Sequence, residues 1–313
     1  MIEIFYLDKK VKKAQLKDLP KLKNNKVWID IFKASKEDIL TIGKIFDIHP
    51  LTVEDLVTSS TRIKVEEFPN YLFCVFYGLL KTKDIALKEV NFILGKDFLI
   101  TNHNHDSPAF QDLKSNPEKI ELLFNKGVEF IFHRLLDKEI DNFSPILETI
   151  DDDIETIEDS VAKKADSKML QNILKMKRKV ILLKKTVIPQ REKISFIAKN
   201  DYKFISKKSI PYFRDIYDHS IRVADSIDNY REAVGNTFDV YMSTLSNNMN
   251  EVMKTLSIIA TIALPLSVIS GIYGTNFTKL PGSGFLYGFW TMIFVMVLVS
   301  VGMLLFFKKR RWF

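Results

Sequence analysis

Two long stretches without a charged side chain, between Lys254 and Lys279 and between Lys279 and Lys308, most constrain how this chain can fold. A helix needs roughly 20 apolar residues to cross the roughly 30 Å hydrocarbon core of a bilayer. We therefore predict two membrane helices and a connecting loop, at residues 255–273, 285–307 and 274–284. A pair of buried core helices is the alternative, and the apolar run that begins at Trp290 argues against it.

The basic residues predict the orientation of these helices. The connecting loop carries only Lys279, whereas the tail at residues 308–313 carries a cluster of Lys and Arg. Cytoplasmic segments that flank membrane helices are enriched in these two residues. We therefore expect a multi-pass protein of the cell membrane with both termini in the cytoplasm. Topology also accounts for the net charge of +7, and no recognised nucleic-acid motif accompanies it, so no nucleic-acid partner is predicted.

The N-terminal part of the chain reads as a cytoplasmic α/β domain at residues 1–105. A helix is predicted over residues 36–46, with Ser35 as its N-cap. The single cysteine, Cys74, excludes a disulfide framework and a multi-cysteine metal site. Apolar runs predict strands at residues 1–7, 26–31, 71–77, 90–94 and 98–101.

The remainder of the chain has helical periodicity. We expect a cytoplasmic helical region at residues 106–211, in which Pro189 should bend or split a helix. From residue 212 onward the pattern predicts one helix with a cytoplasmic part at 212–254 that continues into the first membrane helix, about 90 Å in all. The fold class is therefore α+β: a cytoplasmic α/β domain, long helices and two C-terminal transmembrane helices.

One face of this long helix is polar below Asn250 and carries small residues such as Ser257 and Ser267 within the membrane. Its members recur at alternating steps of three and four residues, the spacing of a seam around which several helices pack. A tight dimer would explain small residues within the membrane. A pore would also explain why the polar line continues below it, and this feature alone does not decide between the two. The face contains Asp239, Asn250, Met253, Ser257, Ala260, Leu264, Ser267, Gly271 and Gly274.

Further candidate residues have simpler interpretations beside the functional ones. The acidic run at Asp151, Asp152 and Asp153 could concentrate cations, but an exposed helix face is the preferred interpretation. His103 and His105 resemble a small metal site, and a polar loop after a strand is the safer interpretation. Since no nucleophile–base constellation stands out, an enzyme is not predicted.

The segment that follows the first membrane helix reads Tyr273-Gly274-Thr275-Asn276-Phe277. By itself it is explained by Gly274 as a left-handed helix C-cap and Asn276 as a turn residue. In this context, before a short loop, a second membrane helix and a basic tail, the order Tyr-Gly-x-Asn-Phe resembles the CorA family. Further runs similar to this family lie at residues 49–55, 212–219, 246–254 and 260–265.

The resemblance implies a funnel-shaped homopentamer whose first membrane helix lines a pore for hydrated Mg²⁺, with Co²⁺ and Ni²⁺ as further candidate ions. Gly274, Thr275 and Asn276 would form a selectivity ring at the outer mouth. Met253 and Leu256 would form an apolar gate, with polar rings of Asn250 and Asp239 below it. Mg²⁺ loses its hydration shell reluctantly, and a pore without acidic residues at membrane depth offers neutral partners to that shell.

The same resemblance implies that Mg²⁺ is also a regulatory ligand that closes the pore from the cytoplasm. The candidate ligands are Asp215, Asp137 and His219, with Asp84 or Glu89 as a partner in the α/β domain. The chain departs from the family at Thr275, where methionine is common, and branches with other residues there are linked to other ions, zinc included. A zinc transporter of the same fold therefore stays an alternative, and a membrane-tethered oligomeric scaffold is a third.

Overall fold

The computed structural model describes residues 1–58, 61–81, 85–163, 165–277, 280–282, 284–310 and 312. It divides into two compact units. Unit 1 comprises residues 1–159 and 168–237, and unit 2 comprises residues 160–167 and 238–313.

Unit 1 is built around a seven-stranded sheet of order β2-β1-β3-β7-β6-β5-β4. Only β3 and β7 pair in parallel among the described strands, and all other neighbours are antiparallel. Each strand predicted from the sequence is present. The strands are β1 (Ile2–Asp8), β2 (Lys10–Ala14), β3 (Val27–Phe32), β4 (Lys64–Glu67), β5 (Tyr71–Lys81), β6 (Ile85–Gly95) and β7 (Phe98–His103).

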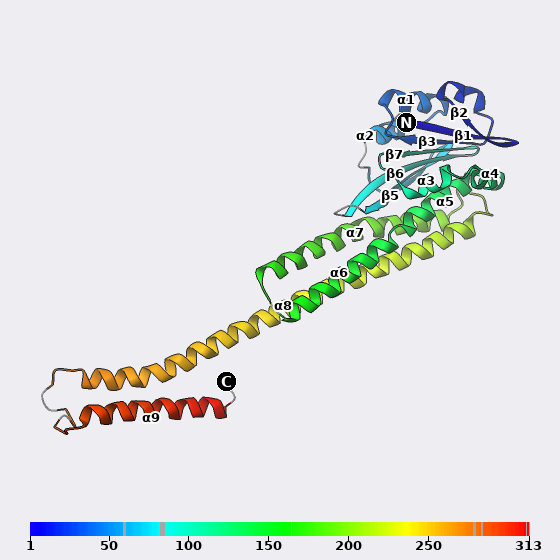
Figure 1. Ribbon diagram of the computed structural model, residues 1–313. Helices are drawn as coiled ribbons and strands as arrows, with labels where there is room; N and C mark the ends of the chain where they lie inside the picture. Colours follow the sequence, from blue (N-terminus) through cyan, green and yellow to red (C-terminus); the bar gives the residue numbers. More distant parts are fainter. Residues whose placement is uncertain are drawn as a thin grey trace. The chain divides into compact units, whose positions relative to one another are not determined.

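The first face of the sheet is covered by α1 (Lys36–Ile45) and α2 (Pro50–Thr58), with the 3₁₀ helix η1 (Leu16–Leu22) beside them (Figure 1). Because side chains alternate along a strand, Ile29 of β3 and Ile93 of β6 enter this core together with Ile42 of α1. Helix α1 begins as predicted, since the Ser35 Oγ accepts a hydrogen bond of 3.2 Å from the Asp38 N–H.

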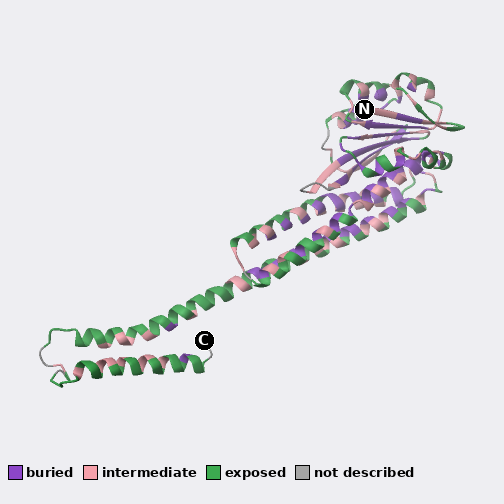
Figure 2. Cartoon of the chain, viewed as in Figure 1, coloured by how far each residue is buried: buried purple, intermediate pink, exposed green. Residues whose placement is uncertain are grey.

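The second face of the sheet packs against α3 (Pro108–Lys114), α4 (Pro117–Lys126) and α5 (Val128–Asp141) (Figure 1). An aromatic row crosses this layer from the sheet outward: Phe92 of β6 lies 5.0 Å from Phe132 of α5, which lies 5.5 Å from Phe213. All three rings are fully buried, and Figure 2 shows buried residues gathered in the sheet and in the helices that face it. The hydrophobic core of unit 1 therefore has two layers.

Three long helices follow: α6 (Ser144–Lys163), α7 (Ser167–Lys199) and α8 (Ile210–Tyr273). The expected split at Pro189 is wrong, because α7 runs through it. The next residue fastens α7 to the sheet: the Tyr77 N–H donates to the Gln190 Oε1 (2.8 Å), and the Gln190 Nε2 donates to the Tyr77 carbonyl (3.2 Å). This anchor to β5 offsets the hydrogen bond that proline cannot make.

Helix α8 is one continuous helix of 64 residues that contributes to both units, which confirms the predicted length. In unit 2 its C-terminal part is followed by α9 (Gly288–Lys309), which begins and ends slightly later than predicted. Both are long and apolar enough to cross a membrane. In the most apolar stretch of each helix, only 6% of the residues of α8 and none of those of α9 are buried. Figure 2 shows these parts as mostly exposed, which argues against two soluble core helices.

Candidate functional site

The predicted pore edge lies on an uncovered side of α8. Leu264 is 70% exposed, Met253 is 61% exposed and Leu256 is 57% exposed. The other predicted pore residues are exposed too. They are Asp239, Asn250, Ser257, Ala260, Ser267 and Gly271.

The opposite side of α8 packs against α9. Ile258 is only 5% exposed, and a groove between the two helices is lined by Ile269 from α8 and Met292 from α9. At about 100° per residue, Ala260 and Ser267 lie roughly opposite Ile258 and Ile269 on the helix. Helix α9 therefore leaves the predicted edge free for contact with another molecule or with an aqueous path.

The edge offers neutral oxygen atoms. The hydroxyl of Ser257 donates to the Met253 carbonyl (2.7 Å), and the hydroxyl of Ser267 donates to the Ala263 carbonyl (2.9 Å). Each hydroxyl has used its only proton, so its lone pairs can accept hydrogen bonds from water. This arrangement suits a cation that keeps its hydration shell, because the waters around a cation point their hydrogens outward.

The Gly-Thr-Asn segment closes the last turn of α8. The Gly274 N–H donates to the Ser270 carbonyl (2.8 Å), and the Thr275 hydroxyl donates to the Ile272 carbonyl (2.8 Å). The left-handed C-cap interpretation is wrong, because the glycines with positive φ among the described residues are Gly127 and Gly282. A Cβ on Gly274 would instead lie 3.0 Å from the Ser270 carbonyl, so close backbone approach explains this glycine. Asn276 is exposed.

The second candidate site is a carboxylate–imidazole cluster between α5 and α8 in unit 1. His219 Nδ1 lies 3.3 Å from Asp141 Oδ1 and 3.8 Å from Asp137 Oδ1, while His219 Nε2 lies 3.7 Å from Asp215 Oδ1. Single ligand atoms of Asp137, Asp141 and His219 lie within 4.8 Å of one another. The structure thus brings together three residues predicted from the sequence and adds Asp141.

The electrostatics of this cluster fit a divalent cation. Burial, followed by the neighbouring Asp141 carboxylate, raises the pKa of Asp137. The Asp137 Oδ1 is buried and accepts no hydrogen bond. A cation between the two carboxylates would supply this atom with a partner and remove the repulsion. Carboxylate oxygens suit Mg²⁺, whereas the imidazole nitrogen of His219 suits transition metals better.

Asp141 was missed by the sequence analysis, although a signal for it exists. It lies four residues after Asp137 on α5, and side chains four residues apart project from the same helix face. Its carboxylate also binds the Lys138 ammonium at 2.8 Å, so it is partly neutralised without a metal.

Of the two candidates in the α/β domain, only Glu89 can be placed, and it lies apart from this cluster. Asp84 is outside the described residues. Glu89 lies on β6 and is 7% exposed; it accepts hydrogen bonds from the Thr61 N–H (2.7 Å) and the Asn91 side-chain amide (2.9 Å). No ligand cluster found among the described residues contains Glu89.

The polar-loop interpretation is wrong for His103, which is the last residue of β7, whereas His105 does follow the strand; each is only 5% exposed. His103 Nε2 lies 3.1 Å from the Asp30 carboxylate, and His103 Nδ1 lies 2.6 Å from the His105 carbonyl. Burial lowers the pKa of His105 to about 4. The parallel pairing of β3 with β7 brings His103 next to Asp30. These buried polar groups therefore belong to the core of unit 1. In contrast, Asp151, Asp152 and Asp153 are exposed on α6 as expected.

Comparisons with known proteins agree on one family. The family described as CorA-like Mg²⁺ transporter protein matches residues 23–309. The cobalt/magnesium transport protein CorA of Thermotoga maritima is 35% identical over 295 residues, which cover 91% of this chain and 83% of that protein.

Solved structures share the fold. The complete CorA magnesium transporter of Methanocaldococcus jannaschii aligns with a TM-score of 0.87 and 21% identity, covering 100% of this chain and 99% of that one. The cytoplasmic domain of ZntB from Vibrio parahaemolyticus aligns with a TM-score of 0.63 and 12% identity, covering 78% of this chain and 98% of that one.

Proposed function

Because this chain belongs to the family of CorA-like Mg²⁺ transporter proteins, we propose that it forms a homopentameric channel for the passive uptake of hydrated Mg²⁺. The observation that carries the proposal is the exposed edge of α8 opposite α9, whose members from Asn250 to Gly274 carry no charge. Five such edges around a common axis would enclose a path lined by neutral oxygens and small side chains. Cobalt is a second candidate ion, as the name of the Thermotoga protein states, and Ni²⁺ is a third.

The selectivity ring of this channel consists of Gly274, Thr275 and Asn276. Five Asn276 amides would accept hydrogen bonds from the water shell of the ion without displacing it, which matches the slow dehydration of Mg²⁺. Met253 and Leu256 form the apolar gate, because an apolar constriction loses its water when it narrows.

Transport needs no nucleotide. A membrane potential is worth about 2.3 kcal/mol per elementary charge per 100 mV, so a divalent cation gains roughly 4.6 kcal/mol on moving inward. At 1.4 kcal/mol per factor of ten, this gain supports an accumulation of more than about a thousandfold. The cytoplasm lies on the side of both termini in this proposal.

Regulation is assigned to the cluster of Asp137, Asp141, His219 and Asp215. Cytoplasmic Mg²⁺ bound there stabilises the closed channel, and its loss leaves repelling carboxylates that favour opening. The raised pKa of Asp137 and the absence of a hydrogen bond to its buried Oδ1 support this role.

The test is Mg²⁺ flux into liposomes that contain the purified full-length protein, with an imposed inside-negative potential. Asn276→Ala should reduce flux by at least about tenfold, because each subunit loses one ring amide. The matched control is Asn248→Ala, which removes an exposed amide from α8 roughly half a turn away from the predicted edge. Normal flux through pentameric Asn276→Ala protein would show that the ring assignment is wrong.

A zinc transporter, passive or proton-coupled, is the second candidate. It is favoured by the Thr275 hydroxyl in the ring segment and by the imidazole of His219 in the cluster, since imidazole is a common zinc ligand. Competition between Mg²⁺ and Zn²⁺ in the same liposomes, with a pH-sensitive dye inside, separates the two ions and reveals coupled proton movement. The absence of flux for every divalent ion would favour an oligomeric scaffold.

A further inference from the structure

A cavity of about 310 Å³ opens at the carboxyl ends of the parallel strands β3 and β7, where α1 and α2 cover the sheet. In α/β sheets the crevice beyond the carboxyl ends of parallel strands is where small ligands commonly bind. Neither the predicted pore edge nor the cluster around Asp137 contributes to its lining.

The buried wall of the cavity carries an unused hydrogen-bond acceptor. Asn91 is 3% exposed; its Nδ2 donates to the Glu89 Oε1 at 2.9 Å, while its Oδ1 has no partner. The amide cannot be turned over, because its oxygen would then face the Glu89 carboxylate. An acceptor held this way beside a carboxylate calls for a ligand that donates hydrogen bonds and carries positive charge.

The mouth of the cavity has the opposite charge. Lys33 and Lys36 are exposed members of its lining, at the entry to α1. Lys33 adopts φ +47°, and its N–H donates to the His103 carbonyl at 3.2 Å, so the chain turns from β3 into α1 at this rim. Between the two polar ends, Ile39 and Leu56 supply apolar walls.

We propose that this cavity binds a small soluble zwitterion, with its ammonium group on Asn91 and Glu89 and its carboxylate or phosphate on Lys33 and Lys36. A divalent cation fits less well, because the site offers one carboxylate, whose oxygens already accept hydrogen bonds, and two ammonium groups of like charge. A polyamine fits less well too, since its second ammonium would meet the lysines. This role is separate from ion conduction.

The test is isothermal titration calorimetry on the full-length protein in detergent. O-phosphoethanolamine and β-alanine are the zwitterionic probes, and ethanolamine, inorganic phosphate and Mg²⁺ are the partial ones. At least one zwitterion should bind about tenfold more tightly than either ethanolamine or phosphate. Asn91→Leu, which removes the acceptor and keeps the volume, should weaken that binding by about tenfold.

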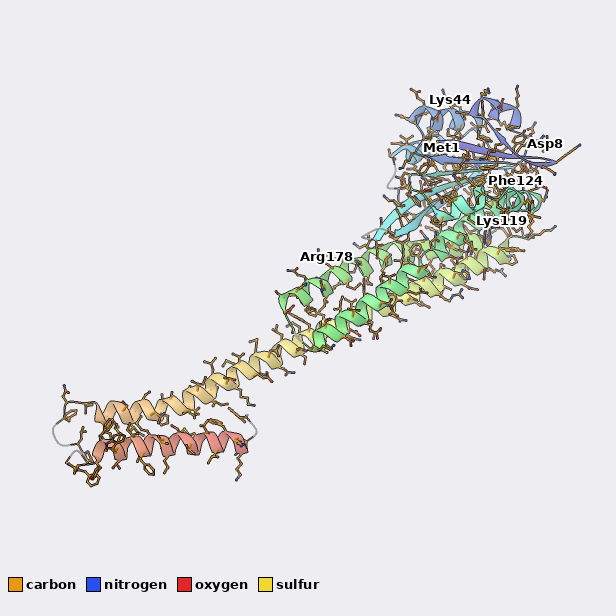
Figure 3. The ribbon with its side chains drawn as sticks, in the orientation of Figure 1. Met1, Asp8, Lys44, Lys119, Phe124 and Arg178 are labelled. Atoms are coloured by element: carbon orange, nitrogen blue, oxygen red, sulfur yellow. The ribbon has the colours of Figure 1, made fainter. Side chains whose placement is uncertain are left out.

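Exposed lysines provide a second pair of variants that leave the core intact. Lys36→Glu should weaken zwitterion binding at least about fivefold, and the matched control Lys44→Glu, near the other end of α1, should leave it within about twofold (Figure 3). The proposal is overturned if no zwitterion binds at up to about 10 mM, or if Lys36→Glu and Lys44→Glu bind the zwitterion equally well. It is also overturned if Asn91→Leu abolishes the binding of Mg²⁺ but leaves zwitterion binding unchanged.

Discussion

Replacing Asp137 by Asn should raise the thermal stability of the metal-free protein. It should also remove most of the further stabilisation that Mg²⁺ gives. The ligand atoms of Asp137 and Asp141 lie within 4.8 Å, and two unit charges at that separation repel by about 1 kcal/mol in water and about 3 kcal/mol at an effective dielectric constant of 20. The amide removes this repulsion and the cost of burying a charge.

The expected change in Tm follows from the separation of the Asp137 and Asp141 ligand atoms. A gain of about 1–3 kcal/mol in a domain of this size corresponds to a rise in Tm of roughly 2–10 °C in metal-free buffer. In contrast, Mg²⁺ at about 100 times its Kd should add about 2.7 kcal/mol to the native protein, and much less to the variant, which lacks one ligand charge.

The assay is thermal unfolding of the detergent-solubilised full-length protein, with and without Mg²⁺. The matched control is Asp152→Asn, an exposed aspartate on α6, which should change neither value. If Asp137→Asn were less stable than the native protein in metal-free buffer and still gained the full Mg²⁺ increment, the assigned repulsion and the assigned ligand would both be wrong.

Three further predictions concern the regulatory cluster and the buried core. Asp215→Asn should keep Mg²⁺ flux high at millimolar internal Mg²⁺; unchanged closure would place the sensor elsewhere. Since the pKa of His105 is about 4 when folded and about 6.5 when unfolded, stability should fall by up to about 3 kcal/mol between pH 6.5 and 4, and unfolding midpoints of His105→Phe should lack that slope. Lys114→Met should cost about 3 kcal/mol in urea unfolding, because it leaves the buried Asp30 carboxylate undercompensated; the exposed control Lys119→Met should cost less than about 1 (Figure 3). Equal losses for the two lysine variants would contradict this role.

Local sequence patterns were sufficient for most elements of the fold, although the short strands β2 and β4 were not predicted. Burial leaves a direct trace in hydropathy, so the strands around Phe73 and Ile93, the helix after Ser35 and the two apolar helices could all be predicted from short windows. The Tyr273–Phe277 segment was equally readable, because its residues are adjacent in the chain and need no long-range contact to stand together.

The surroundings of individual side chains depended on tertiary structure instead. His103 was misread as part of a polar loop because its partner, Asp30, comes from a strand far away in the sequence, and only the parallel pairing of β3 with β7 buries the two together. Glu89 lines a separate cavity because β6 lies beside β7 in the sheet, where residues from β7, α1 and α2 complete the lining. Next to Pro189, a hydrogen bond between Gln190 and Tyr77, far apart in the sequence, also holds α7 against the sheet.

By itself, then, the sequence determined which segments are strands, soluble helices and membrane-length helices, since hydropathy and periodicity act over a few neighbouring residues. Tertiary structure decided which charged and polar groups meet. Asp137 and Asp141 face His219 only because α5 and α8 pack together, and the resulting burial and repulsion are properties of that contact rather than of any residue alone.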